Sequence, residues 1–252
     1  ETFFGYITFD AYYLALKLKK IVPNFLLKIL KKIVGPPKFS DEYLTFSTKL
    51  RKFFNSIHLN KKYLLAAWMG CLNVQDMSNL FDEQISADDI YDDLNNIYTD
   101  DLSLMRSAQL YYFKFYLPMI LVKVDQAGML NSVESRSPFL SKKIINFSLD
   151  HDVKKLYKLF KKKYFIRKTF SEIVPKEVLN RKKHGFAFPK EILLQDKNLI
   201  EKLLDYNLLT NKDFFKIKYN NFLNKTEDCS LYIWNELMLN IALQNLNISK
   251  IS

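Results

Sequence analysis

Residues 117–140 read LPMILVKVDQAGMLNSVESRSPFL. The first part of this stretch is apolar over several turns and predicts a helix, and Pro138 ends the pattern because proline biases the preceding residue away from helical geometry. Asp125, Glu134 and Arg136 add charge to this apolar neighbourhood. Ionised side chains are rarely buried unless they are paired or used in a site. Two interpretations stand open: a buried structural ion pair, or charges exposed to a cleft while the apolar flank of the helix stays packed.

Helical periodicity extends through most of the remaining chain, with apolar residues at three- and four-residue spacing. We expect helices over residues 9–21, 24–34, 41–54, 61–72, 86–98, 102–117 and 231–246. Ser40 and Asn60 precede two of these segments, and Ser86 begins a third, as candidate N-cap residues. Strand signals are short and scattered, so the sequence predicts a mostly α chain.

The composition excludes several classes of protein. Hydrophobic residues make up 48% of the 252 residues, which is far from the composition of a disordered chain. The two cysteines and three histidines are scattered, so we expect no disulfide scaffold, no metal site and a reducing, cytoplasmic location. Apolar stretches are too short for a membrane span, and no signal peptide is visible. Because the sequence begins with Glu rather than Met, within a stretch that has the pattern of folded sequence, we expect a fragment whose upstream part is lost or encoded elsewhere.

The positive charge is concentrated in one segment. Residues 154–190 hold 13 Lys and Arg against two acidic residues, which equals the net charge of +11 of the whole chain. On a helix, Lys163 and Arg167 would share a face with Phe170. The segment is either a solvated surface or a contact for a polyanion. One alternative function is therefore a non-catalytic remnant or interaction module that binds an acidic partner or nucleic acid through residues 154–190; another is a peripheral membrane role for the amphipathic residues 11–34.

Several motifs, taken in order, resemble the C-terminal half of the synthetase domain of the glutamine-hydrolysing asparagine synthetases. That family shows Asp-Glu-x-Phe-Gly-Gly-Tyr, Lys-Val-Asp-Arg-x-Ser-Met, Ser-Leu-Glu-x-Arg-x-Pro-Phe-Leu-Asp, Lys-x-x-(Leu/Ile)-Arg-Lys and Arg-x-Lys-x-Gly-Phe. The corresponding stretches here are ETFFGY (1–6), KVDQAGM (123–129), SVESRSPFL (132–140), KYFIRK (163–168) and RKKHGF (181–186). The resemblance covers residues 1–252 as a partial synthetase domain. It is strongest over 112–190, with 1–111 as a helical insert region and 191–252 as C-terminal helices.

The resemblance implies a reaction and a set of site residues. In the family, ATP adenylates the side-chain carboxylate of aspartate, and ammonia derived from glutamine then displaces AMP. Lys163 corresponds to the catalytic lysine, whose ammonium offsets negative charge on the phosphates. The residues that correspond to substrate-binding positions are Glu134, Arg136 and Lys123. Supporting positions are Asp125, Arg167, Arg181, Lys183 and Glu1.

The resemblance also implies what lies outside this chain. The fold would be the helical C-terminal portion of an adenine-nucleotide α-hydrolase-like (PP-loop ATPase) synthetase domain, with its parallel sheet missing. No Ser-Gly-Gly-x-Asp-Ser pyrophosphate loop and no N-terminal cysteine nucleophile occur in the sequence. ATP and Mg²⁺ are therefore expected as co-substrates of the complete enzyme, and none is expected to bind to this chain alone, which we expect to be inactive. The expected partners are PP-loop and glutaminase domains on the same or a separate chain, and aspartate or a related carboxylate acceptor. We expect no nucleic acid, and a homo-oligomer stays open.

Four positions depart from the family pattern. Gln126 replaces an arginine, Gly128 a serine, Ser141 an aspartate and Phe4 a glycine. Because relatives use the same chemistry on other carboxylates, these differences leave the identity of the acceptor open.

Overall fold

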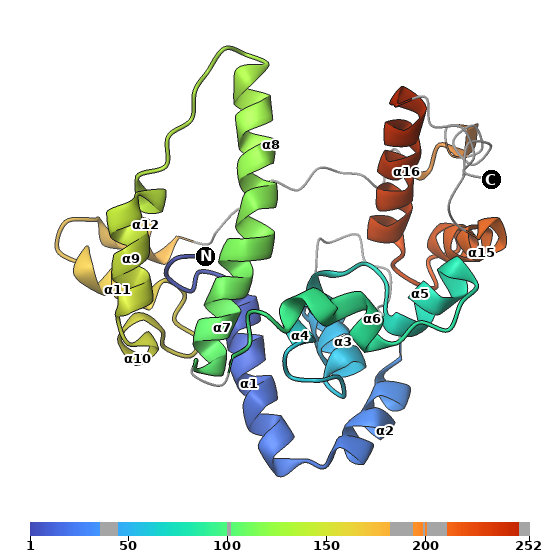
Figure 1. The fold of residues 1–252 in the computed structure, drawn as a ribbon, viewed down its shortest axis with the longest axis horizontal. Coiled ribbons are helices and arrows are strands. Elements are labelled where there is room, and N and C mark those ends of the chain that lie inside the picture. The colour runs from blue at the N-terminus through green and yellow to red at the C-terminus, as the bar shows by residue number, and fades with distance from the viewer. Residues whose placement is uncertain (36–44, 100–101, 182–193, 199, 201–210, 247–252) are drawn as a thin grey trace. The chain divides into compact units, whose positions relative to one another are not determined.

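The computed structural model describes residues 1–35, 45–99, 102–181, 194–198, 200 and 211–246 of the chain. Within these ranges every regular element is a helix, and β-structure is limited to one antiparallel bridge between Lys158 and Lys161. Figure 1 shows the helices and the loops that join them. The mostly α fold expected from the sequence is confirmed for this part of the chain.

The chain divides into two units, each built from segments that are distant in sequence. Unit 1 comprises Glu1–Ile21 and Asp93–His184, and unit 2 comprises Val22–Asp92 and Gly185–Ser252. The helices of unit 1 are α1 (Ile7–Ile21), α7 (Leu104–Tyr111), η2 (Tyr112–Tyr116), α8 (Leu117–Met129), η3 (Pro138–Leu140), α9 (Lys142–Asp150), α10 (Val153–Leu156), α11 (Tyr164–Thr169) and α12 (Lys176–Asn180). Among the described residues of unit 2, the helices are α2 (Asn24–Val34), α3 (Phe46–Ser56), α4 (Leu64–Met69), α5 (Val74–Phe81), α6 (Ala87–Tyr91), α15 (Lys212–Leu223) and α16 (Ser230–Asn245). The 3₁₀ turn η1 (Asp92–Leu94) leads from unit 2 into unit 1.

The core of unit 1 is aromatic. Phe9 and Tyr12 of α1 and Tyr112 of η2 are fully buried. The ring centroids of Phe9 and Tyr112 lie 4.6 Å apart, and Phe4 meets Phe9 edge-on at 4.8 Å. Buried aromatic side chains remove a large apolar area from water and prefer such tilted or edge-on contacts. These contacts therefore fix α1 against η2 and hold the N-terminal segment beside both.

The helices α7, η2 and α8 follow one another without a break. The middle element, η2, is a turn of π-helix that lies immediately before Leu117 and Pro118. Proline has no backbone N–H, so Pro118 cannot complete the α-helical hydrogen bond to the preceding turn, and π-turns commonly absorb such a defect. The chain thus continues as a helix through the proline.

Beyond its first turn, α8 is exposed along its length. Leu117 is buried and Ile120 is half-buried, but the large hydrophobic side chains from Leu121 to Met129 are 41–55% exposed. In Figure 1, α8 extends past α9, α11 and α12, and the segment after it returns toward these helices. The expectation that the apolar flank of this helix stays packed is wrong for the described residues, because α8 runs beyond the aromatic core of its own unit.

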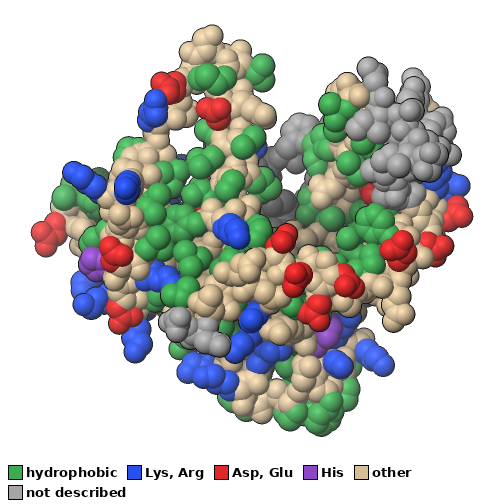
Figure 2. Space-filling model, in the orientation of Figure 1, with side chains coloured by type: hydrophobic (Ala, Val, Ile, Leu, Met, Phe, Trp, Pro, Cys, Tyr) green, Lys and Arg blue, Asp and Glu red, His purple; other side chains and the backbone are tan. Residues whose placement is uncertain are grey.

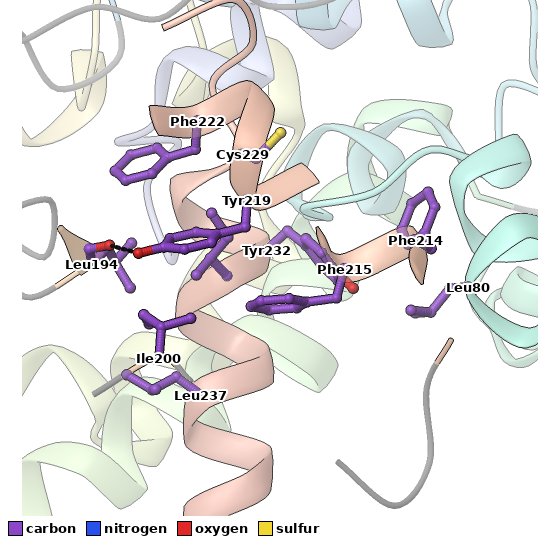
Figure 3. Packing of buried hydrophobic residues seen from close by; sticks show 11 residues of the cluster. Leu80, Leu194, Ile200, Phe214, Phe215, Tyr219, Phe222, Cys229, Tyr232 and Leu237 are labelled. Atoms are coloured by element: carbon purple, nitrogen blue, oxygen red, sulfur yellow. Dashed lines mark hydrogen bonds between the residues drawn. The ribbon is translucent and has the colours of Figure 1, made fainter. Parts of the chain in front are cut away.

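Unit 2 has a separate hydrophobic core between α15 and α16. Figure 3 shows Phe214, Phe215 and Tyr219 of α15 packed with Tyr232 of α16, and Leu80 of α5 at the edge of the cluster. The ring centroids of Phe215 and Tyr232 lie 5.9 Å apart. Helices with aromatic faces of this kind obtain most of their stability from packing rather than from helix propensity.

Of the three predicted N-cap residues, one is confirmed, one is wrong and one lies outside the described residues. Ser86 is confirmed as an N-cap: its side chain accepts a hydrogen bond from the Asp89 N–H, and the Asp89 carboxylate accepts one from the Ser86 N–H. Asn60 is wrong as the N-cap of α4, because that helix begins at Leu64 after a turn in which the Asn60 side chain accepts a hydrogen bond from the Lys62 N–H. Ser40 lies outside the described residues.

Candidate functional site

Lys163 stands at the beginning of α11, in the left-handed backbone conformation, with φ of 53° and ψ of 38°. The expectation that Lys163, Arg167 and Phe170 share one helix face is therefore wrong, since α11 starts after Lys163 and ends before Phe170. The Lys163 N–H donates a hydrogen bond to the Phe4 carbonyl at 3.3 Å, and the Lys163 carbonyl accepts one from the Arg167 N–H at 2.9 Å. The side chain of Lys163 is exposed. Its ammonium is thus accessible to solvent while its backbone is held.

The N-terminal segment of the chain lies directly against this lysine. A Cβ atom added to Gly5 would lie 3.2 Å from Cε of Lys163, so the absence of a side chain at Gly5 leaves room for the lysine stem. Phe3 stacks on Phe165 of α11 at 5.7 Å and meets Phe139 of η3 edge-on at 6.4 Å. These aromatic contacts place the segment that contains residues 3–5 in contact with both η3 and α11.

Glu1 belongs to the same N-terminal segment and is held by a tyrosine. The Tyr6 hydroxyl donates a hydrogen bond to Oε1 of Glu1 at 2.7 Å. Burial and the neighbouring Glu1 carboxylate both raise the pKa of Tyr6, so the phenol stays protonated and remains a donor at neutral pH. Tyr6 in turn stacks on Tyr112 of the core at 5.0 Å. The structure therefore brings together the segment that carries Glu1 and the backbone of Lys163.

Glu134 and Arg136 form an ion pair with each other. Their side chains are 63% and 83% exposed, respectively, so the interpretation as a buried structural ion pair is wrong. An exposed pair of this kind contributes little to stability. From the order of the motifs we predict that these two side chains and Lys163 meet in one cleft.

The segment that carries this pair begins with a tight turn after α8. The Val133 N–H donates to the Gly128 carbonyl at 2.9 Å, and Ser132 has a φ of 55°. A Cβ atom at position 128 would lie 2.5 Å from the Val133 carbonyl oxygen, a distance that side chains do not tolerate. Gly128 is therefore required by this turn, which accounts structurally for one of the four departures noted in the sequence.

The remaining candidate residues are exposed and lie apart along the chain. Lys123 and Asp125 project from α8 two residues apart and therefore point in different directions. Arg167 lies on α11, and Arg181 follows α12. Lys183 lies outside the described residues. Near Asp125, an open hollow of about 440 Å³ is lined by Gln126, Met129 and Leu130 at the end of α8.

The donor set around Lys163 suits a phosphate group better than a metal ion. Lys161 and Lys162 precede Lys163, and all three amines are exposed. Among the described residues no group of three His, Cys, Asp or Glu side chains could hold a metal.

No helix in the described ranges is long and apolar enough to cross a membrane.

Comparison with known proteins decides the family. The sequence model of the asparagine synthase family matches residues 1–244. The chain belongs to this family. It is 29% identical over 197 residues to asparagine synthetase [glutamine-hydrolyzing] 1 of Bacillus subtilis (strain 168), a match that covers 75% of this chain and 29% of the length of that relative. No solved structure matches the chain.

The order of the family motifs points to the exposed Lys163 and to Glu1 as candidate residues, but it does not reveal the groups that hold them in place. Asp10 of α1 is buried and accepts hydrogen bonds from the Tyr157 hydroxyl and the Phe160 N–H. The one signal in the sequence was an acidic residue directly beside Phe9, near the start of an amphipathic helix whose other charged residues are lysines. A buried carboxylate in that position needs donors, and the sequence does not reveal which distant residues supply them.

Proposed function

We propose that this chain is the helical part of an ATP-dependent ligase that converts the side-chain carboxylate of aspartate to the amide of asparagine. The carboxylate oxygen attacks the α-phosphorus of ATP, and the bond to the departing pyrophosphate breaks. Ammonia from glutamine then attacks the acyl carbon and releases AMP. The proposal includes PP-loop and glutaminase portions, on the same or a separate chain, to bind the nucleotide and to supply ammonia, and it includes a cytoplasmic location.

Family membership supports the class of reaction, and one observation carries the assignment of a residue. Lys163 is held in the left-handed conformation by the carbonyl of Phe4, three residues from Glu1. Non-glycine residues persist in this conformation only where the surroundings impose it, and such residues cluster at functional sites. In the proposed mechanism the Lys163 ammonium faces the phosphates and stabilises the negative charge that develops on them. Mg²⁺, when bound with ATP, would neutralise further phosphate charge.

Roles for the other residues follow from their chemistry. Arg136 offers a planar pair of donors to a carboxylate of the amino-acid substrate, and Glu134 orients Arg136 through their ion pair. The remaining polar residues that we propose for the substrate cleft are Lys123, Asp125, Arg167, Arg181 and Glu1, together with Lys183 from outside the described residues. The departure at Gln126 leaves the acceptor as aspartate or a related carboxylate.

The test is aspartate-dependent release of pyrophosphate by the synthetase that contains this chain and the two further portions. We expect Lys163→Ala to lower this rate by about two to three powers of ten, the scale of one lost transition-state contact. Lys161→Ala and Lys162→Ala are matched controls in the same basic segment and should act weakly. Glutaminase activity and the melting temperature should be retained in all three variants.

A second candidate function, binding of an acidic partner through residues 154–190, is separated by the same variants. Lys154, Lys155 and Lys161 are exposed and form no ion pair with the carboxylates that the structure describes. On the face seen in Figure 2, however, Lys and Arg side chains over α9–α12 are interspersed with acidic ones rather than gathered in one patch. Equal, small losses from the three lysine variants, with salt-sensitive binding of an acidic polymer, would favour this second function and overturn the catalytic role of Lys163.

A further inference from the structure

Three bulky residues with left-handed backbone conformation meet at one place in unit 1. Phe4, Phe160 and Lys163 have φ values of 53°, 61° and 53°. Phe160 and Lys163 both belong to residues 157–163, which we call the lysine loop, and Phe4 accepts the hydrogen bond of the Lys163 N–H. A side chain in this conformation is unfavourable in isolation, so the lysine loop needs external restraints to keep its shape.

One external restraint is a buried carboxylate on α1. Asp10 is only 6% exposed. Its Oδ1 accepts a hydrogen bond from the Tyr157 hydroxyl at 2.8 Å and another from the Phe160 N–H at 3.2 Å, so it binds the lysine loop at its first residue and at its first left-handed residue. Hydrogen bonds to an ionised acceptor are stronger than those between neutral groups.

The helix that carries Asp10 is itself well anchored. Asp10 lies in the first turn of α1, where the positive end of the helix dipole favours a carboxylate. The neighbouring Phe9 and Tyr12 are fully buried. The ring of Phe4 contacts those of both Phe9 and Tyr157. Both restraints on the loop, the Asp10 carboxylate and the Phe4 carbonyl, therefore originate from the same rigid part of the N-terminal segment.

We propose that Asp10 is a positioning residue for Lys163, which fixes the lysine loop so that the Lys163 ammonium is presented in one direction. This inference rests on the proposed function for the catalytic role of Lys163, but the mechanical link between Asp10 and the loop stands on the contacts alone. Asp10 itself does not touch substrate. Asp10 affects the reaction through the position of the Lys163 ammonium relative to the bound phosphates. Small displacements of such a group have large effects on rate.

The test uses a graded set of variants in the synthetase described above. Asp10→Ala removes the acceptor, Asp10→Asn keeps an acceptor oxygen without the charge, and Tyr157→Phe removes a single donor. Tyr98→Phe is the matched control, because Tyr98 is also buried in unit 1 but interacts with Tyr12 rather than with the loop. The readouts are hydrogen exchange of the Phe160 and Lys163 amides, the melting temperature, and kcat and KM for aspartate in pyrophosphate release.

We expect the Phe160 amide to exchange about tenfold faster in Asp10→Ala, the scale of one lost hydrogen bond. We expect kcat to fall by about tenfold to a hundredfold because the ammonium is displaced. KM for aspartate should change by less than about threefold, because the substrate carboxylate contacts are intact. Asp10→Asn and Tyr157→Phe should lie between Asp10→Ala and the wild type in both exchange and kcat, and Tyr98→Phe should match the wild type.

Two outcomes overturn the inference, and they are distinguishable from failure of the proposed function. A folded Asp10→Ala or Asp10→Asn protein with wild-type exchange at Phe160 shows that the Asp10 carboxylate does not restrain the loop. Faster exchange with unchanged kcat, while Lys163→Ala is inactive, shows that Lys163 is catalytic but needs no positioning by Asp10. If Lys163→Ala is fully active, the proposed function itself is wrong, and the catalytic half of the inference falls with it.

Discussion

Two lysines, one in each unit, differ in the exposure of the side chain and in the conformation of the backbone. Lys163 in unit 1 has an exposed amine and an unfavourable backbone conformation. Lys218 in unit 2 lies in a regular helix, its side chain is 10% exposed, and its amine lies 3.0 Å from Asp76 and 2.9 Å from Glu227. A buried charge is tolerated only when it is paired, whereas an accessible amine in a constrained backbone is available for a ligand. The difference fits a stabilising role for Lys218 and is consistent with the proposed catalytic role of Lys163.

The largest effect on stability is expected from Lys218→Ala. This change leaves Asp76 and Glu227 partly buried without their cation, and loss of one partner of a buried pair costs about 3–5 kcal/mol. Both tryptophans, Trp68 and Trp234, lie in unit 2, so urea denaturation followed by tryptophan fluorescence reports on this unit.

The control for this prediction is Lys216→Ala on the same helix. Lys216 is 62% exposed and pairs with Asp213 at 3.5 Å, so its loss should change the free energy of unfolding by less than about 0.5 kcal/mol. Equal effects of the two substitutions would mean that the buried ion pairs of Lys218 do not stabilise the fold more than an exposed pair does.

A related, smaller effect is expected at alkaline pH. Burial lowers the pKa of Lys218, but Glu227 and Asp76 outweigh it, and the net pKa is raised above the usual value of 10.5. The folded state therefore holds this proton more tightly than the unfolded state, so the stabilisation is complete below pH 10.5 and is lost as the pH rises through the folded pKa. Denaturation at several pH values should show a loss of stability above pH 10.5 that is smaller in Lys218→Ala than in the wild type. Parallel curves for the two proteins would contradict the pairing.

Lys163→Gly should have the reverse effect on stability. Glycine adopts positive φ freely, so the substitution relieves backbone strain and should raise the free energy of unfolding of unit 1 by about 1 kcal/mol. Lys163→Ala keeps the Cβ atom and provides the control. Urea denaturation followed by circular dichroism compares the two, and a glycine variant less stable than the alanine variant would show that the left-handed conformation is not a source of strain.

The smallest effect is expected from Arg136→Gln. Because the ion pair with Glu134 is exposed, its loss should change the free energy of unfolding by less than about 0.5 kcal/mol. The same substitution should raise KM for aspartate in the synthetase if Arg136 binds the substrate carboxylate. A large loss of stability would instead show that the pair is structural.

Local pattern predicted much of the fold, and contacts between distant segments account for what it missed. The helices α1, α2, α8 and α16 follow from the spacing of their apolar residues, and the capping box at Ser86 follows from its own side chains and those of Asp89. The left-handed start of α11 could not be predicted in this way. It depends on the Phe4 carbonyl, which comes from the other end of unit 1.

The candidate site shows the same limit. The motif order points to Lys163, Glu134 and Arg136 as candidates, because spacing along the chain is preserved in a motif. It carried no information about exposure, so the ion pair could be interpreted as buried when it is not. Asp10 was visible as the one acid of an amphipathic helix, but its donors Tyr157 and Phe160 are about 150 residues away, beyond the reach of any local pattern.

The π-turn before Pro118 has a consequence for how the length of this chain can vary. A π-turn contains one residue more than an α-turn, and each residue of an α-helix advances the chain by about 100° around the axis. Deletion of one residue within Tyr112–Tyr116 would therefore rotate all of α8 by about that angle relative to the aromatic core, and it would turn Lys123 and Asp125 to new directions without altering either side chain. In variants of this chain that keep Pro118, the number of residues in η2 should therefore stay constant even where the residue types change.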